Sequence, residues 1–156
     1  MNRRDLQDAL KSNNVRAFLR AIRLGEGTSD DMGYYRIVGG GTFTDDSTHP
    51  RVKVYIERYK VYSTAAGAYQ IIWPTWTGLT KHYGFPDFSP ECQDEAAVAL
   101  IAEKGALDDA IAGRLEEAVI KCSPIWASLP WSEAGQRKES FAAVQKEYVS
   151  NGGSLA

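Results

Sequence analysis

Glu26 is the residue whose surroundings most suggest chemistry in this sequence. It lies between Gly25 and Gly27 in the segment LGEGTSDD, where an amphipathic stretch ends. The carboxyl end of a helix disfavours negative charge, and a neighbouring sheet could shield the side chain from water. Both effects raise a carboxyl pKa, so Glu26 could donate a proton at pH 7. A glutamate near a helix end is also commonly an exposed side chain, and this pattern alone leaves both interpretations open.

A second stretch, STAAGAYQII at residues 63–72, combines hydroxyls and small residues with Tyr69 and Gln70. Small residues allow a ligand to approach the backbone, and a tyrosine and an amide provide directed hydrogen bonds around it. The stretch could therefore form one wall of a ligand site. The alternative is a buried tyrosine followed by a glutamine that caps the next helix.

Motifs typical of several other chemistries are missing. The two histidines and two cysteines lack metal-ligand spacing, and the sequence has no phosphate-binding glycine loop and no G-x-S-x-G motif. We therefore expect no metal and no cofactor. The net charge of -2 argues against nucleic acid as a partner. The basic stretch HPRVKVYIERYK at residues 49–60 could meet an acidic ligand, but a solvated hairpin face is the simpler interpretation.

Length and composition bound the architecture. The 156 residues, 44% hydrophobic and 24% charged, are typical of one folded domain. We expect this domain to span residues 1–156 as a monomer, with residues 1–13 as a loosely ordered N-terminal extension. No apolar run approaches the roughly 20 residues of a spanning helix, and no apolar segment follows the basic start. We therefore expect a cytoplasmic location without stable membrane insertion.

Hydrophobic periodicity predicts the elements around Glu26. Apolar residues recur at helical spacing over 15–22, with an asparagine at 13 or 14 as N-cap, and the helix is expected to end at Gly25. This period disappears over 29–64, where the runs YYRIVGGGTFT and VKVYI and the glycine turns predict a small β-region.

Helices are predicted in most of the remaining chain. Pro74 fits the first turn of a helix within 71–84, and Ser89 followed by Pro90 predicts a helix that ends near Gly105. Further helices are expected within 106–113, 115–122 and 133–149. A helix, a small β-region and a run of helices predict an α+β fold with a cleft between the sheet and the helical body.

Five ordered segments resemble the lambda-type lytic transglycosylases, a family of phage endolysins. The matching segments are GEGT, GGGTFTDDSTHPR, STAAGAYQ, FSPECQDEAAVAL and CSPIWASLP, and the likeness runs from about residue 15 to about residue 152. Matches in the same order and at similar separations are far more specific together than any one of them.

The resemblance implies a lysozyme-like α+β fold in which a small β-region and a helical body flank a substrate cleft. It implies cleavage of the β-1,4 bond between N-acetylmuramic acid and N-acetylglucosamine in peptidoglycan, with formation of 1,6-anhydromuramic acid. Glu26 takes the place of the family's catalytic acid. Five residues match positions assigned here to substrate binding: Ser63, Gly67, Tyr69, Gln70 and Trp126. The family setting also implies glycan strands as partner, and accumulation in the host cytoplasm until a holin gives access to the cell wall.

Several positions depart from the family pattern. Gly25 replaces the serine before the glutamate, Ala68 replaces an arginine, and an alanine replaces the first glycine of S-T-G-A-G. Ala134 stands where the family has a tyrosine that could face the substrate, and Trp131 could compensate for this loss. None of these changes removes Glu26.

Alternative functions depend on how Glu26 is used. A hydrolytic lysozyme on the same fold would let water replace the C6 hydroxyl, and hydrolysis usually needs a second carboxylate. A lone glutamate fits transglycosylation better. The candidates for a second carboxylate are Asp30, Asp31, Asp45 and Asp46. An inactive glycan-binding module is disfavoured by the presence of Glu26, and a nucleic-acid-associated phage protein by the acidic net charge.

Overall fold

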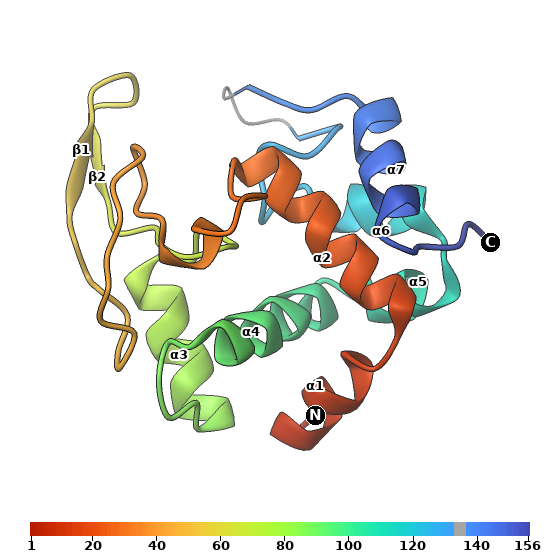
Figure 1. Cartoon of the computed structure of the whole chain (residues 1–156), viewed down its shortest axis with the longest axis horizontal. Coiled ribbons are helices and arrows are strands. Elements are labelled where there is room, and N and C mark those ends of the chain that lie inside the picture. The colour runs from red at the N-terminus through yellow and green to blue at the C-terminus, as the bar shows by residue number, and fades with distance from the viewer. Residues whose placement is uncertain (133–136) are drawn as a thin grey trace.

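The computed structural model describes residues 1–132 and 137–156 and shows an α+β fold, as the sequence predicts. A two-stranded hairpin stands at one side of a helical body (Figure 1). The elements in chain order are α1 (Arg3–Ala9), α2 (Asn13–Glu26), the 3-10 helix η1 (Gly33–Tyr35), β1 (Val54–Ile56), β2 (Val61–Ser63), α3 (Trp73–Tyr83), α4 (Pro90–Glu103), α5 (Leu107–Ala112), α6 (Leu115–Cys122) and α7 (Phe141–Ser150).

Helix α2 carries Glu26 as its last residue, so the predicted end at Gly25 is wrong. Gly27 ends the helix with φ 72°, a left-handed conformation that glycine adopts without a Cβ clash. The predicted asparagine N-cap is also wrong, because the Ser12 hydroxyl accepts the Val15 N–H instead. The apolar stripe of α2 is buried, and the helix packs against α4, α5 and α7.

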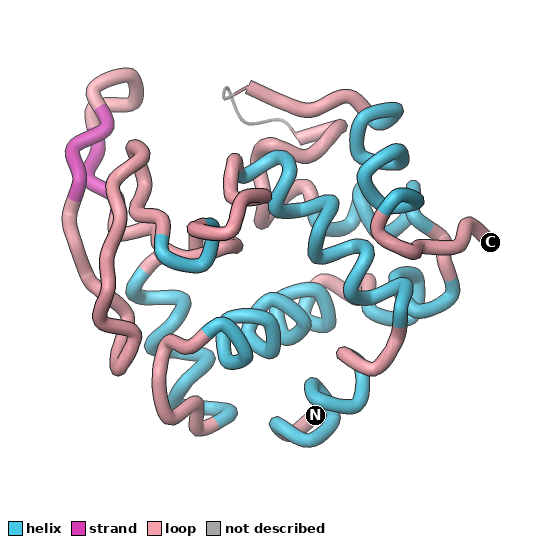
Figure 2. Tube along the Cα trace, viewed as in Figure 1, coloured by secondary structure: helices cyan, strands magenta, loops and turns pink. Residues whose placement is uncertain are grey.

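The β-region is smaller than the sequence predicts. Strands β1 and β2 pair antiparallel, with Tyr55 opposite Tyr62 (Figure 2). Within residues 1–132 and 137–156 they form the only sheet. The YYRIVGGGTFT run forms η1 and isolated bridges instead of strands. Gly39 and Gly40 have φ of 88° and 99°, and this tight turn limits pairing to single residues.

Helix α4 lies across the middle of the body and is buried along most of its length (Figure 1). Its predicted start is confirmed, because Ser89 is the N-cap and Pro90 is the first helical residue. The predicted helix over 71–84 is confirmed as α3, which has Pro74 in its first turn and ends at Gly84 in the left-handed region.

The N-terminal residues are helical rather than loosely ordered. Asn2 and Asp5 form a reciprocal capping box at the start of α1. Leu6 is fully buried in the core, and Arg3 forms an ion pair of 2.8 Å with Glu95 of α4. The capping box and the buried leucine supply the local and tertiary contacts that order this segment.

The C-terminal helices complete the body. The predicted helices within 106–113 and 115–122 are confirmed as α5 and α6. The last predicted helix, 133–149, is observed only from Phe141, where Ser140 is the N-cap. Residues 133–136, including Ala134, lie outside the described residues. In the part of the chain that is described, every helix is too short or too polar to cross a membrane.

Candidate active site

Glu26 opens onto a cleft between the end of α2 and the β-hairpin. The cleft has a volume of about 480 Å³. Its walls come from the end of α2, from the hairpin and from three loop segments. The residues that line it are Gly25, Glu26, Val38, Gly39, Ile56, Tyr59, Val61, Ser63, Ala65, Gln70, Ile125 and Ala127. The left-handed turn at Gly27 leads the chain away and leaves the Glu26 side chain at the helix end, facing this space.

Ser128 is the hydrogen-bond partner of the Glu26 carboxyl group. Its Oγ donates to Glu26 Oε2 at 2.8 Å, and the Ser128 side chain is itself buried. A Cβ atom at position 25 would lie 2.5 Å from Ser128 Oγ. The glycine that replaces the family serine therefore permits the close approach of Ser128 to Glu26.

The pKa of Glu26 is raised from 4.5 to about 7. Burial is the larger cause, because it penalises the charged carboxylate. The hydrogen bond from Ser128 lowers the pKa and partly opposes burial. Near neutral pH the carboxyl group therefore exchanges its proton readily, as a group that acts first as acid and then as base requires.

Ser63 and Gln70 share the cleft with Glu26. Gln70 has φ 50°, a left-handed conformation that is costly for a residue with a side chain. Its Nε2 donates to the Gly67 carbonyl at 2.9 Å, which fixes the amide at the cleft wall. Ser63 is the last residue of β2, and its Oγ accepts the Ala65 N–H at 3.2 Å.

The other three predicted site residues lie behind this wall. The side chains of Tyr69 and Trp126 are each 2% exposed, and neither lines the cleft that contains Glu26. Tyr69 Oη donates to Asp94 Oδ1 at 2.5 Å, and Trp126 Nε1 donates to the Tyr69 carbonyl at 3.0 Å. Gly67 is buried with φ 84°. All three hold the segment that presents Gln70.

A buried polar cluster beneath the site was missed by sequence reasoning. Arg23 is 4% exposed, and its guanidinium donates to the Thr28 carbonyl at 2.9 and 2.6 Å and lies 4.6 Å from the ring centre of Tyr34. The hydroxyl of Tyr34 donates to Asp94 at 2.9 Å. The cluster ties the loop after Glu26 to α4. Asp94 lies in one of the resembling segments, and Ser128 in another, but spacing alone does not assign their partners.

The candidates for a second carboxylate are all absent from the described lining of the cleft: Asp30, Asp31, Asp45 and Asp46. Asp30 pairs with Arg36 at 2.6 Å, and Asp46 accepts a hydrogen bond of 2.9 Å from Tyr35. Among the described lining residues, Glu26 is the one carboxylate. Three or more histidine, cysteine or acidic side chains arranged to hold a metal ion do not occur in the described ranges.

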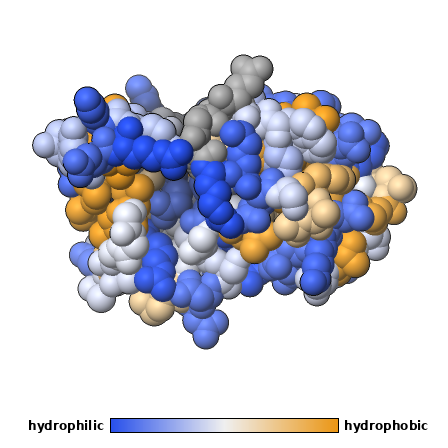
Figure 3. All heavy atoms as spheres, turned by 90° about the horizontal axis from the view of Figure 1, so that it is seen from above, coloured by the Kyte–Doolittle hydropathy of each residue, from blue (hydrophilic) through white to orange (hydrophobic). Residues whose placement is uncertain are grey.

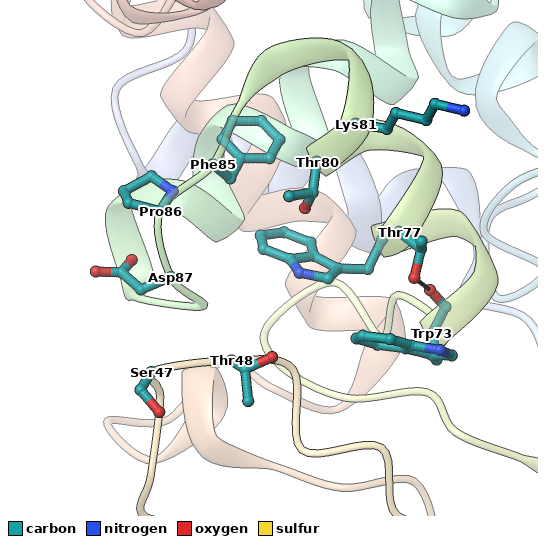
Figure 4. Close-up of a pocket in the computed structure, with 10 residues that line it drawn as sticks. Ser47, Thr48, Trp73, Thr77, Thr80, Lys81, Phe85, Pro86 and Asp87 are labelled. Carbon is teal, nitrogen blue, oxygen red and sulfur yellow. Dashed lines mark hydrogen bonds between the residues drawn. The ribbon is translucent and has the colours of Figure 1, made fainter.

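Another cavity, of about 430 Å³, lies between α3, the α3–α4 connection and the loop at residues 47–48 (Figure 4). It shares no lining residue with the Glu26 cleft. Trp73 and Thr77 lie at one end of this cavity and Asp87 at the other, with Ser47 and Thr48 on the loop that faces α3 (Figure 4). This cavity is therefore separate from the chemistry at Glu26.

Known proteins are similar to this chain in sequence and in fold. Residues 16–155 match the endolysin family model. The endolysin of Escherichia phage P2 is 40% identical over 154 residues, which cover 90% of this chain and 93% of that protein. The chain belongs to the endolysin family. Endolysins degrade peptidoglycan, so this endolysin is an enzyme of cell-wall breakdown.

Solved structures confirm the lysozyme-like fold of this endolysin. The endolysin of Escherichia phage lambda is 38% identical over 150 residues, covering 92% of this chain and 94% of that protein. Bacteriophage lambda lysozyme complexed with a chitohexasaccharide superposes with a TM-score of 0.88 at 38% identity, covering 92% of this chain and 97% of that chain. A second structure of lysozyme from bacteriophage lambda has a TM-score of 0.83 at 37% identity, with the same shares covered.

Proposed function

We propose that this endolysin is a lytic transglycosylase. It cleaves the β-1,4 bond between N-acetylmuramic acid and N-acetylglucosamine and leaves a 1,6-anhydromuramic end. The observation that carries the proposal is Glu26, a half-buried carboxyl group with a pKa of about 7 and the one carboxylate in the described lining of the cleft. A reaction that needs a single acid and base fits this site better than one that needs two carboxylates.

In the first half of the reaction Glu26 acts as general acid. The protonated carboxyl group donates its proton to the glycosidic oxygen as the bond from that oxygen to C1 of the muramic residue breaks. The carboxylate that forms is stabilised by the hydrogen bond from Ser128 to Oε2. Because burial raises its pKa, the Glu26 side chain is protonated in a large share of the protein molecules near neutral pH, as this step requires.

In the second half the Glu26 carboxylate acts as base. It takes the proton from the C6 hydroxyl of the muramic residue while that oxygen bonds to C1 on the same sugar. The proton removed from O6 replaces the one given to the leaving sugar, so Glu26 returns to its protonated state. A tethered nucleophile can reach an effective molarity of about 10⁵ M or more when it is well oriented, which makes an activated water unnecessary.

The remaining site residues divide into contacts and supports. Gln70 and Ser63 line the cleft and can hydrogen-bond to sugar hydroxyl and acetamido groups. Gly67, Tyr69 and Trp126 act as positioning residues, because their contacts are with the protein. The chitohexasaccharide complex of lambda lysozyme supports a glycan strand as the ligand of the corresponding cleft.

The family also supports a biological setting for this enzyme. We propose that it acts as a monomer, accumulates in the host cytoplasm and reaches the wall when a holin permeabilises the inner membrane. Peptidoglycan glycan strands are then its binding partner.

The substitution Glu26→Gln tests the assigned role of the carboxyl group. It should lower the rate of clearing of purified sacculi by a factor on the order of 10³ or more, because both proton transfers lose their group. Binding to sacculi, measured by co-sedimentation, should be retained. Glu116→Gln, on the exposed side of α6, is the matched control and should be fully active. A folded Glu26→Gln protein that clears sacculi at the wild-type rate would refute the assignment.

A further inference from the structure

The hairpin concentrates positive charge that the chain as a whole does not have. Residues 51–60 contain four basic side chains and one acidic one, whereas the net charge of the chain is -2. Lys53 is exposed just before β1, and Arg58 and Lys60 are exposed in the turn that follows it. Seen from above, blue hydrophilic side chains lie beside an orange apolar area at the hairpin end of the molecule (Figure 3). The patch is a local positive field on an acidic protein.

Aromatic side chains accompany this charge. Tyr55 and Tyr62 lie opposite each other across the two strands, with ring centres 5.1 Å apart. Their exposed fractions are 49% and 69%, and Tyr59 in the turn is 43% exposed. Exposed tyrosines beside cations can pack against peptide groups and donate hydrogen bonds to them.

The hairpin is also a wall of the catalytic cleft. Ile56 and Val61, which are paired across the strands, line the cleft with Glu26, and so does Tyr59. Because side chains alternate along a strand, Tyr55 and Tyr62 lie on the opposite, outer face. Arg58 and Lys60 flank Tyr59 in the turn and therefore stand at the rim of the cleft.

We infer that the hairpin turn and its outer face bind the acidic stem peptides of peptidoglycan. We define this hairpin surface as Lys53, Tyr55, Arg58, Lys60 and Tyr62. The inference rests on the proposed function, because it takes peptidoglycan as the polymer in the cleft. Each N-acetylmuramic acid carries a short peptide with free carboxylates on its lactyl group. A peptide that leaves the cleft passes the basic rim and then reaches the exposed tyrosines.

The chemistry of the surface favours a peptide over a lipid membrane. Membrane-binding surfaces insert large apolar side chains such as tryptophan, phenylalanine and leucine. The hairpin surface presents tyrosines and cations instead, and its rim is continuous with the site where the glycan strand is cleaved. Opposite charge on substrate and rim would raise the encounter rate and the affinity rather than the rate of bond cleavage.

The test uses two variants of the full chain and two substrates. The double variant Lys53→Gln/Lys60→Gln removes two exposed charges from the hairpin surface. As the matched control, Lys104→Gln/Lys146→Gln removes one exposed charge just after α4 and one on α7. The substrates are native sacculi and sacculi whose carboxylates have been converted to amides, and the readout is the rate of soluble muropeptide release at limiting and at saturating substrate.

On native sacculi the hairpin variant should show kcat/KM about five- to tenfold lower than wild type with kcat unchanged. On amidated sacculi the wild type should fall to the level of the hairpin variant, and the control should follow the wild type on both substrates. An equal loss on both substrates, or no loss at all, would overturn the inference.

Two further outcomes are separable. The hairpin variant could lose the co-sedimentation of the wild type with vesicles containing phosphatidylglycerol while its kinetics on native sacculi stay unchanged. This result would assign the surface to a membrane and overturn the inference. The products of the wild type are analysed in the same samples. A wild type that releases no anhydro muropeptide from either substrate would contradict the proposed transglycosylase, whatever the charge dependence shows.

Discussion

Glu26 and Ser128 together set the chemistry at the scale of single residues. Burial raises the pKa of the Glu26 carboxyl group, and the hydrogen bond of 2.8 Å that the Ser128 hydroxyl donates to it limits that rise. Both the protonated acid and the carboxylate are therefore well populated near neutral pH. The sequence predicts Glu26 from its place at a helix end, but Ser128 is 102 residues away, and only the folded chain brings the two together.

Ser128→Ala tests this balance through the pH dependence of activity. The Ser128 hydroxyl favours the carboxylate, so its removal raises the pKa of Glu26 above about 7. Because the first step needs the protonated acid, the descending limb of kcat/KM should move to higher pH. The maximal rate should fall roughly fivefold to tenfold, because the carboxylate loses a hydrogen bond worth about 1 kcal/mol.

The control for this experiment is Ser63→Ala, which removes another hydroxyl from the same cleft, one whose oxygen accepts the Ala65 N–H. Its descending limb should stay at the wild-type pH. A limb that stays in place in Ser128→Ala, or moves to lower pH, would show that Ser128 does not set the acidity of Glu26.

At the scale of elements, the segment 67–70 is the support of the cleft wall. Gln93 of α4, which is 1% exposed, accepts the Ala68 N–H through Oε1 at 2.9 Å and donates to two backbone carbonyls. A Cβ atom at Gly67 would lie 2.3 Å from that same Oε1. The glycine is thus required twice, for its φ of 84° and for the close approach of Gln93.

Gly67→Ala should lower the free energy of unfolding by about 2 kcal/mol or more, because strain in φ adds to a clash with a buried amide. Denaturant unfolding measures this loss. Gly84→Ala is the matched control, because Gly84 has φ 74° but open space around its Cβ position. It should lose only the cost of the left-handed conformation, about 1 kcal/mol.

Equal losses in the two variants would mean that Gln93 gives way and that the clash does not matter. If Gly67→Ala were as stable as the wild type, the segment 67–70 would not be held as described. Either result would remove the argument that Gly67 positions Gln70.

At the scale of the whole molecule, the sequence predicts the α+β class, the cleft and most helices from periodicity and caps. Ser89 with Pro90 and Gly84 are local signals, and they place the start of α4 and the end of α3 correctly. Tertiary contacts decide the rest. Burial of Leu6 in the core orders α1. In the segment where strands were predicted, the hydroxyls of Tyr34 and Tyr35 donate hydrogen bonds to Asp94 and Asp46.

The predicted site residues were likewise placed only in part by local sequence, because tertiary contacts decide which of them face the cleft. Glu26, Ser63 and Gln70 share one cleft. Tyr69 and Trp126, predicted to contact substrate, are buried against other protein groups. A tyrosine before a helix looks the same in sequence whether it faces solvent or core, because its orientation depends on Asp94 in another helix.

The most direct test of the central claim is mass spectrometry of muropeptides released from purified sacculi, with the digestion carried out in water enriched in heavy oxygen. A single acid that directs the C6 hydroxyl to C1 predicts products lighter by one water than hydrolytic muropeptides, without heavy oxygen at C1. Reducing-end products that carry one heavy oxygen would contradict the account, because water would then be the nucleophile and a hydrolytic lysozyme would be the correct assignment.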